Sequence, residues 1–317
     1  MRAAAAERAV EGPELVAAVL EGLAAHPKRI ASKWLYDARG SRLFDRICEL
    51  DAYYPTRTET QILKANAAPL AAFVPAGAAL VELGSGSSAK TRILLDALDD
   101  LAVYVPVDIS AEHLRHAAAE LAADYPQLPV WPVVGDFTAG LNLPHELDDT
   151  PKLLFFPGST LGNLEPEDAV ALLRRLGEVA NVAGFVIGID LEKDVARLRA
   201  AYDDPEGVTA AFNTNLLVRL NRELDATFDP AAFAHAARWN AERRRIEMHL
   251  VSRCAQEVRV AGRRFAFAEG ESIHTENSHK YTLDGFAELA TRGGWRTRER
   301  WLDDAALFSV HLLVPAR

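Results

Sequence analysis

Short apolar runs alternate with amphipathic stretches through the middle of the chain, from about residue 80 to residue 190. A short apolar run is typical of a buried strand, whereas apolar residues spaced three and four apart indicate one face of a helix. This pattern predicts strands at 80–83, 103–107, 129–134, 152–156 and 184–189, and helices at 93–98, 110–123 and 165–180. Such an alternation is typical of a parallel sheet with helices on both faces.

The pattern differs on either side of this region. Before it, helices are predicted at 13–25, 41–50 and 57–73, with a loop at 32–40. After it, residues 206–240 predict helices, with Phe233 and Ala236 among the apolar positions. Residues 244–275 alternate like antiparallel strands, with Met248 on one face and Glu247 and His249 on the other. The last predicted elements are a helix at 282–292 and strands at 295–301 and 308–314.

The final two strands form a hairpin that completes a seven-stranded sheet with one antiparallel strand. Methyltransferases that use S-adenosylmethionine (SAM) close their sheet in this way. We therefore expect an α/β, Rossmann-like class I methyltransferase fold with a second, α+β domain. The predicted SAM-binding domain comprises 57–193 and 282–317, and the predicted substrate-binding domain comprises 1–56 and 194–281, over the strand ends.

A glycine-rich turn, Gly84-Ser-Gly-Ser-Ser88, directly follows the first of these strands. Three ligands suit it: a dinucleotide, a phosphate held by a P-loop, or SAM. Ala89 replaces the second glycine of the P-loop pattern, and the dinucleotide pattern is matched only weakly. Asp108 ends the next strand, 24 residues after Gly84, where an acid suits a ribose with two free hydroxyls. The alternative without a ligand is an ordinary α/β core with a turn rich in glycine and serine.

Polar and glycine residues gather after several predicted strands. They lie at Gly84–Ser88, Asp108, Asp136–Phe137 and Gly158–Asn163. Ligands of such sheets bind outside the carboxyl ends of the strands, so this edge is the predicted site.

Charge, cysteine content and the lack of long apolar runs exclude several classes of protein. The chain has 317 residues and a net charge of −10, with no basic run, which argues against a nucleic-acid partner. Cys48 and Cys254 lie far apart and predict neither a disulfide framework nor a zinc framework. The N-terminus lacks the apolar core of a signal peptide, and no run of 18 apolar residues occurs. We expect a cytoplasmic monomer without a membrane partner.

Several segments together resemble the histidine-specific Nα-methyltransferases of ergothioneine biosynthesis. They are Tyr53–Arg57, Glu82–Arg92, Pro106–Ser110, Phe156–Asn163, Ala201-Tyr202, Gly207–Asn213, Arg245–Leu250 and Ile273–Ser278. The resemblance implies SAM-dependent methylation of the α-amino group of L-histidine, up to three times, giving hercynine. Fungal relatives that methylate a tryptophan derivative share the same plan, so another amino acid is the alternative substrate.

The resemblance also implies roles for individual residues. SAM would be held by Gly84, Lys90, Asp108, Asp136 and Phe137. Histidine would be held by Tyr53, Asn163, Tyr202, Glu276 and Ser278, with Asn163 and Tyr202 as the catalytic residues and Gly158, Thr209 and Met248 nearby. The chain departs from the family at His279, where a tyrosine is expected.

Each cofactor residue also has an ordinary structural explanation. Asp108 could be a strand-end acid, and Asp136-Phe137 could be an ordinary loop pair rather than an adenine acceptor and its apolar wall. Lys90 could bind the SAM carboxylate, but a solvated surface position is the usual fate of lysine.

The substrate residues are weighed in the same way. Asn163 could orient the amine and carboxylate of a substrate, or it could cap helix 165–180. Tyr53 and Tyr202 could be substrate donors or core tyrosines. Glu276 and Ser278 would face one side of an extended segment and could read the two imidazole nitrogens of histidine.

Two further classes of function are open at this point. A P-loop ATPase or kinase would use Lys90, Thr91 and Asp190, and a binding protein would take SAM without turnover. A metal site is not expected, because His274, Glu276 and His279 lack a further partner at a recognisable spacing.

Overall fold

The computed structural model describes residues 2–86 and 89–316, and the side chains of all of these except 2–11 and 89. The chain divides into two compact units. The small unit contains residues 1–47 and 195–277, and the large unit contains 48–194 and 278–317. Among the described residues, none of the helices combines the length and the apolar character needed to cross a bilayer.

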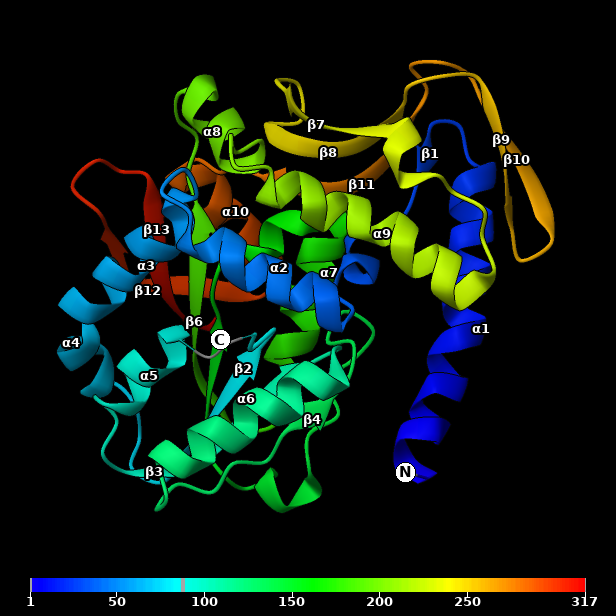
Figure 1. Cartoon of the computed structure of the whole chain (residues 1–317). Coiled ribbons are helices and arrows are strands. Elements are labelled where there is room, and N and C mark those ends of the chain that lie inside the picture. The colour runs from blue at the N-terminus through cyan, green and yellow to red at the C-terminus, as the bar shows by residue number, and fades with distance from the viewer. Residues whose placement is uncertain (1, 87–88, 317) are drawn as a thin grey trace. The chain divides into compact units, whose positions relative to one another are not determined.

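The large unit is built on a single mixed sheet (Figure 1). Its strands are β2 (Ala78–Leu83), β3 (Leu101–Asp108), β4 (Val133–Val134), β5 (Lys152–Phe156), β6 (Val182–Asp190), β12 (Trp295–Leu302) and β13 (Phe308–Pro315). Within the described residues the sheet has seven strands in the order β12-β13-β6-β5-β2-β3-β4. β13 is antiparallel to both of its neighbours, and the other pairs are parallel. The predicted class I methyltransferase sheet is confirmed.

Both faces of this sheet are buried. Val81 and Leu154 pack on one face with Phe286, while Leu80 and Leu153 pack on the other with Leu94. Alternate residues of each strand thus enter two different cores, which is why these strands read as continuous apolar runs.

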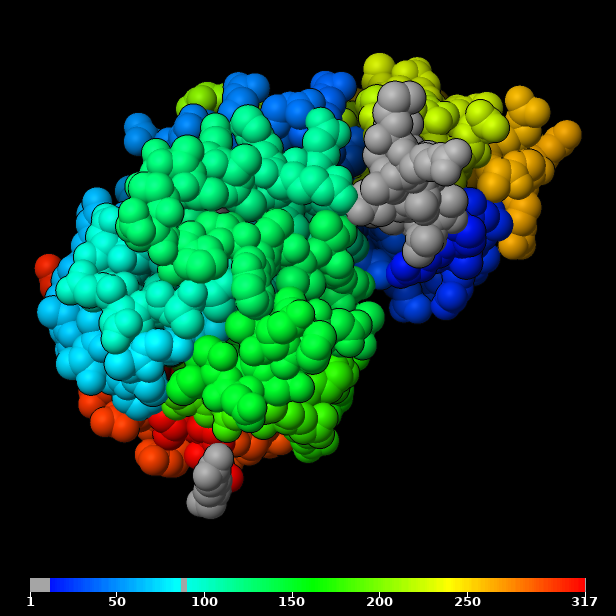
Figure 2. Space-filling view, turned by 90° about the horizontal axis from the view of Figure 1, so that it is seen from below, coloured from blue at the N-terminus to red at the C-terminus, as the bar shows by residue number. Residues whose placement is uncertain are grey.

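Helices cover the two faces of the sheet. Those of the large unit are α3 (Tyr54–Ala65), α4 (Ala67–Ala71), α5 (Ala89–Leu95), α6 (Ala111–Asp124), α7 (Pro166–Gly177) and α10 (Leu283–Arg292), with short turns η2 (His145–Leu147) and η3 (Thr160–Asn163). The core around Val81 includes residues of α7 and α10, whereas the core around Leu80 includes residues of α3 and α5. Figure 2 shows a face of this unit formed by its cyan-to-green segments, roughly residues 70 to 180.

One predicted strand of the large unit is much shorter than expected. The prediction covers 129–134, but β4 contains only Val133–Val134, and Val130 makes an isolated bridge to Tyr104. Pro129 and Pro132 cannot donate to a ladder, and β4 lies at the edge of the sheet, where such a strand is tolerated.

The small unit combines helices with a curved sheet (Figure 1). Its helices are α1 (Arg2–Ala24), η1 (Ser32–Leu35), α2 (Ala38–Glu49, which ends just past the unit), α8 (Val195–Tyr202), α9 (Val208–Leu224) and η4 (Pro230–Ala232). Its strands are β1 (Lys28–Arg29), β7 (Phe233–Asn240), β8 (Arg245–Ser252), β9 (Gln256–Val260), β10 (Arg263–Phe267) and β11 (Ser272–His279, which also enters the large unit). The order β1-β11-β8-β7 forms one sheet, and β9 and β10 form a hairpin.

The helical prediction for the end of segment 206–240 is wrong. Residues Phe233–Asn240 form β7, which pairs antiparallel with β8 from Phe233 opposite Ser252 to Asn240 opposite Arg245. Phe233 and Ala236 are spaced like one face of a helix, but pairing with β8 decides the conformation here.

The N-terminal prediction also needs correction. Ser41 is buried inside α2 and does not begin it. Asp37 holds the start of this helix instead, because its Oδ1 accepts the Gly40 N–H at 2.8 Å.

Candidate active site

The strand order of the large sheet reverses between β2 and β5, which defines the place where ligands of open α/β sheets bind. Gly84 follows β2 with φ +67°, and Gly158 follows β5 with φ +80°. Glycine adopts this left-handed conformation at little cost. A Cβ added at Gly84 would meet only Phe137, at 3.8 Å, and one at Gly158 would lie 3.5 Å from Lys90 Nζ. The backbone at this edge therefore permits close approach of a ligand.

Asp108 connects the end of β3 to the glycine-rich turn. Its Oδ1 accepts the Ser110 N–H at 2.8 Å, and its Oδ2 accepts the Gly86 N–H at 3.4 Å. Burial raises the pKa of this carboxyl, and the backbone N–H groups oppose the shift. Asp108 is thus held by local backbone at the strand end, and a carboxylate has further lone pairs for ribose hydroxyls.

The segment after β4 supplies an acid and an aromatic wall. Asp136 Oδ1 accepts the Thr138 N–H at 2.9 Å, which fixes the turn. The Phe137 ring packs edge-on against Phe156 of β5, with ring centroids 5.2 Å apart. Phe137 therefore presents an apolar surface near Gly84, as an adenine ring requires.

Lys90 is not a surface lysine. Its Nζ lies 2.5 Å from Glu59 Oε2, and its side chain is only 14% exposed. The same Glu59 oxygen accepts the Gly158 N–H at 2.8 Å. Gly188 makes room for this acid, because a Cβ there would lie 1.9 Å from Glu59 Oε1. Burial lowers the pKa of Lys90, but the Glu59 charge outweighs it and the pKa is raised, so a cation stands beside the glycine-rich edge.

These groups fit SAM. Asp108 offers an acceptor for ribose, Phe137 an apolar wall and Lys90 a cation for a carboxylate. The Ser85 hydroxyl within the turn is buried and has no hydrogen-bond partner among the described residues. A buried polar atom of this kind is usually satisfied by a partner, and a polar ligand would provide one.

The loop after β5 is held in an unusual conformation. Ser159 adopts φ +58°, which is uncommon for a residue other than glycine and is often found at functional sites. Its Oγ accepts the Asp190 N–H at 2.9 Å. At the other end of the loop, Asn163 is the last residue of η3 and is half-buried. Asn163 does not cap the following helix, because the N-cap residue of α7 is Glu165.

His279, the departure from the family pattern, supports this loop. Its Nδ1 lies 2.9 Å from the Gly162 carbonyl oxygen, to which it must donate. Gly162 is required for the contact, since a Cβ there would lie 2.9 Å from the His279 carbonyl oxygen. The imidazole thus fixes the backbone next to Asn163, which sequence analysis did not foresee.

A buried charge network lies behind the same loop. Asp190 at the end of β6 forms ion pairs with Lys193 at 2.5 Å and Lys280 at 2.7 Å, and it accepts the Tyr54 hydroxyl at 2.8 Å. Burial raises the pKa of Asp190, but the two ammonium charges outweigh it and the pKa is lowered. Lys280 also donates to the Ser278 Oγ at 2.6 Å. Tyr54, Lys193 and Lys280 were not predicted as site residues. Tyr54 and Lys280 lie far from Asp190 in the sequence, so no local pattern indicates that these side chains meet.

Comparison with known proteins identifies the family of this chain. Residues 15–315 match the family described as histidine-specific methyltransferase, SAM-dependent. The chain belongs to the SAM-dependent, histidine-specific methyltransferase family. The chain is 45% identical over 303 residues to the histidine N-alpha-methyltransferase of Mycolicibacterium smegmatis, covering 93% of both chains.

More distant relatives are similar over smaller parts or at lower identity. The ergothioneine biosynthesis protein 1 of Neurospora crassa is 33% identical over 208 residues, covering 63% of this chain and 24% of the fungal protein. A solved SAM-dependent methyltransferase of Clostridium acetobutylicum is 11% identical with a TM-score of 0.46, covering 80% of this chain and 90% of the other.

Family membership makes this chain a SAM-dependent methyltransferase, and the P-loop alternative is wrong. The contacts agree with this result. Thr91 Oγ1 donates to Glu82 at 2.5 Å and Asp190 pairs with two lysines, so neither stands as a magnesium ligand.

The methyltransferase carries its predicted site residues in both units. Gly84, Lys90, Asp108, Asp136, Phe137, Tyr53, Asn163 and Ser278 belong to the large unit, and Tyr202 and Glu276 to the small unit. Tyr53 precedes α3 and is 7% exposed, and Tyr202 ends α8 and is 8% exposed. Glu276 is half-buried on β11, two residues before Ser278.

Within the small unit, Tyr202 is held by a chain of hydrogen bonds. His235 Nε2 donates to the Tyr202 carbonyl oxygen at 2.8 Å, and His235 Nδ1 accepts from Asn213 at 3.0 Å. Asn213 Oδ1 in turn accepts the Thr275 hydroxyl at 2.7 Å. Burial lowers the pKa of His235, which keeps the ring neutral and suited to this pattern. This series of hydrogen bonds connects α8 to β11 through side chains of α9 and β7.

Proposed function

We propose that this methyltransferase methylates the α-amino group of L-histidine up to three times, giving hercynine for ergothioneine biosynthesis. The observation that carries the proposal is the match of residues 15–315 to a histidine-specific family. The named activity of the Mycolicibacterium smegmatis relative and the pathway named for the Neurospora crassa relative support it.

SAM would be held by Gly84, Lys90, Asp108, Asp136 and Phe137. When bound, it supplies an electrophilic methyl group that the substrate amine displaces from sulfur. The protein's contribution is positioning, which can account for about 7–11 kcal/mol of a barrier. The loop that carries Asn163 suits this task, because its Ser159 hydroxyl accepts the Asp190 N–H and its Gly162 carbonyl accepts from His279.

The amine must be neutral to act as a nucleophile. An α-amino group in a peptide has a pKa of about 8, and the positive charge of SAM nearby would favour the neutral form further. We propose that the Asn163 carbonyl accepts an amine N–H while its amide donates to the substrate carboxylate. Tyr53 and Tyr202 would supply further hydroxyl donors.

The imidazole of histidine would be read by Glu276 and Ser278. A carboxylate accepts the imidazole N–H, which leaves the other ring nitrogen as an acceptor. Ser278 Oγ accepts a hydrogen bond from Lys280, and we propose that its hydroxyl donates to this second nitrogen. The pair therefore suits one tautomer of histidine and disfavours an indole, which has no second ring nitrogen.

We also propose that the enzyme acts on free histidine as a cytoplasmic monomer, without a nucleic-acid or membrane partner. The net charge of −10 and the lack of a basic run in the sequence support the absence of a nucleic-acid partner.

A panel of free amino acids tests the substrate. The protein is incubated with SAM and each amino acid, and mass spectrometry follows the gain of methyl groups. Histidine is expected to gain up to three, and tryptophan, phenylalanine and glutamine none. Methylation of tryptophan without methylation of histidine would overturn the substrate assignment, and SAM binding without any turnover would indicate a binding protein.

A further inference from the structure

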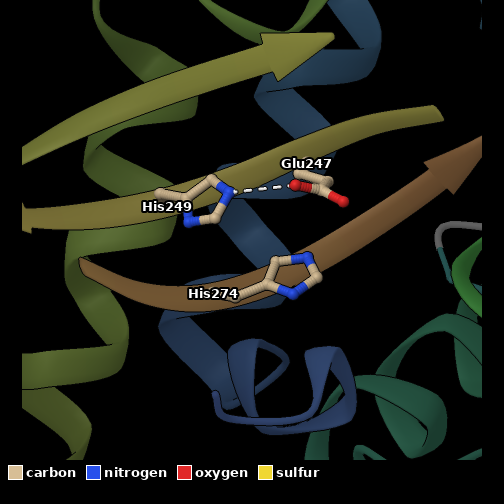
Figure 3. A group of neighbouring side chains, drawn as sticks. All are labelled: Glu247, His249 and His274. Atoms are coloured by element: carbon tan, nitrogen blue, oxygen red, sulfur yellow. Dashed lines mark hydrogen bonds and ion pairs between the residues drawn. The ribbon is translucent and has the colours of Figure 1, made fainter. Parts of the chain in front are cut away.

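Two histidines and a glutamate meet on one face of the small unit's sheet (Figure 3). Glu247 and His249 lie two residues apart on β8, and His274 lies on the adjacent strand β11. One carboxylate oxygen and one nitrogen of each ring all lie within 4.8 Å of one another. His249 Nε2 is 3.4 Å from Glu247 Oε2, and the two rings stack with centroids 5.0 Å apart.

The remaining polar atoms of these three side chains have partners that orient them. Glu247 Oε1 accepts from Arg245 Nε at 2.8 Å and from Asn240 at 3.0 Å, which leaves Oε2 as the oxygen facing His249. His249 Nδ1 lies 3.2 Å from Ser272 Oγ.

His274 is oriented in the same manner. Its Nε2 lies 3.1 Å from the Glu276 carbonyl oxygen and must donate to it, so Nδ1 is the nitrogen that would bind an ion. Asn277 also hydrogen-bonds this side chain. Outer contacts of this kind, to a carbonyl, a hydroxyl and an arginine, are typical of groups that bind a metal ion.

The spacing of the group also suits an ion. Zinc binds nitrogen at about 2.0–2.1 Å and carboxylate oxygen at about 2.0–2.2 Å, so two ligands of a tetrahedral site lie roughly 3.3–3.5 Å apart. The contact between His249 and Glu247 already has this spacing, at 3.4 Å. The ligand nitrogen of His274 lies within 4.8 Å of the other two ligand atoms, so this side chain must turn to reach the same distance.

We propose that Glu247, His249 and His274 bind a divalent transition-metal ion of the Zn²⁺ type, with a water as the fourth ligand. Two imidazoles and one carboxylate form a ligand set that Zn²⁺ takes in proteins. The site joins β8 to β11 and, through His274, holds the backbone at Glu276. Sequence analysis expected no metal because it sought all the ligands near His274, whereas two of them come from the neighbouring strand.

Untagged protein, stripped with a chelator, tests the site. Co²⁺ is added as a spectroscopic probe, and Zn²⁺ retained after dialysis is measured by elemental analysis. We expect about one equivalent of Zn²⁺, a visible absorption of tetrahedral Co²⁺, and a higher unfolding temperature with Zn²⁺ than without. His249→Ala and His274→Ala are each expected to weaken metal binding by at least about 100-fold.

His145→Ala is the matched control, because that side chain is 87% exposed and lies outside the small unit. It should retain wild-type metal content. His249→Gln, a gentler change, guards against a fold defect and should lose the Co²⁺ absorption while its circular dichroism stays native. Failure of the wild type to retain Zn²⁺, or equal retention by all variants, overturns the proposal. Neither result depends on which amino acid the enzyme methylates.

Discussion

The cofactor edge of the large unit and the β11 region are built in different ways. At the cofactor edge, glycine conformations and strand ends place Gly84, Asp108 and Phe137, and most contacts are to neighbouring backbone. Around β11, Ser278 depends on a lysine that pairs with Asp190, 90 residues earlier in the chain. The proposed cofactor residues Gly84 and Asp108 are therefore placed by local geometry, and Lys90 is held by the distant Glu59. Ser278, which is proposed to read the substrate, is oriented by a long-range side-chain network.

The largest effect on stability is expected when the buried ion-pair network around Asp190 is broken. Asp190→Asn removes the carboxylate that pairs with both Lys193 and Lys280. Removing one partner of a buried ion pair typically costs about 3–5 kcal/mol, and we expect a loss of this size in the free energy of unfolding. Chemical denaturation measures it. Glu167→Gln is the control, since its pair with Arg292 is exposed and should contribute at most about 1 kcal/mol.

The cofactor edge is tested by Asp108→Ala. Hydrogen bonds to charged groups contribute about 1.5–3 kcal/mol, so SAM affinity should fall by roughly 10- to 150-fold. Isothermal titration calorimetry measures the change. Asp99→Ala, at an exposed position nearby in sequence, should leave the affinity unchanged. Equal affinities of Asp108→Ala and wild type would remove Asp108 from the cofactor site.

A buried histidine of the large sheet makes stability depend on pH. Burial, with a contribution from Arg300, lowers the pKa of His311 to about 3, against about 6.5 in an unfolded chain. As pH falls from 6.5, the unfolded state takes up a proton that the folded state does not, so stability is lost. The loss is roughly 1.4 kcal/mol per pH unit, or about 2 kcal/mol between pH 6 and 4.5.

Replacement of this histidine gives the matching measurement. His311→Gln should be less sensitive to acid than wild type by about the same 2 kcal/mol in denaturant titrations at the two pH values. Parallel losses in both proteins would show that His311 does not titrate as described.

The smallest effect concerns the loop that carries Asn163. His279→Ala removes one hydrogen bond to the Gly162 carbonyl, worth about 1 kcal/mol. We expect kcat for histidine to fall roughly fivefold while SAM affinity is kept, as measured by steady-state kinetics and calorimetry. An unchanged kcat would mean that the loop is held without this contact.

Helices, strands and turns that depend on residues close together in the sequence could be predicted from the sequence alone. The strand and turn before α5 follow from a short apolar run and a glycine cluster, and the strands predicted within 244–275 are present as β8, β9, β10 and the start of β11. The segment Phe233–Asn240 was misassigned because its conformation depends on pairing with β8. The partners of Lys90 and Ser278 could not be predicted, because no periodicity relates residues that meet only in the folded chain.

The central claim is that Glu276 reads the substrate while the cofactor edge works independently of it. Glu276→Gln separates the two most directly when kcat/KM for histidine and the Kd of SAM are measured on the same preparation, with exposed Glu269→Gln as control. We predict that kcat/KM falls by roughly 10- to 150-fold while the Kd of SAM stays within about twofold of wild type. A parallel loss of SAM affinity, or an unchanged kcat/KM, would contradict the account.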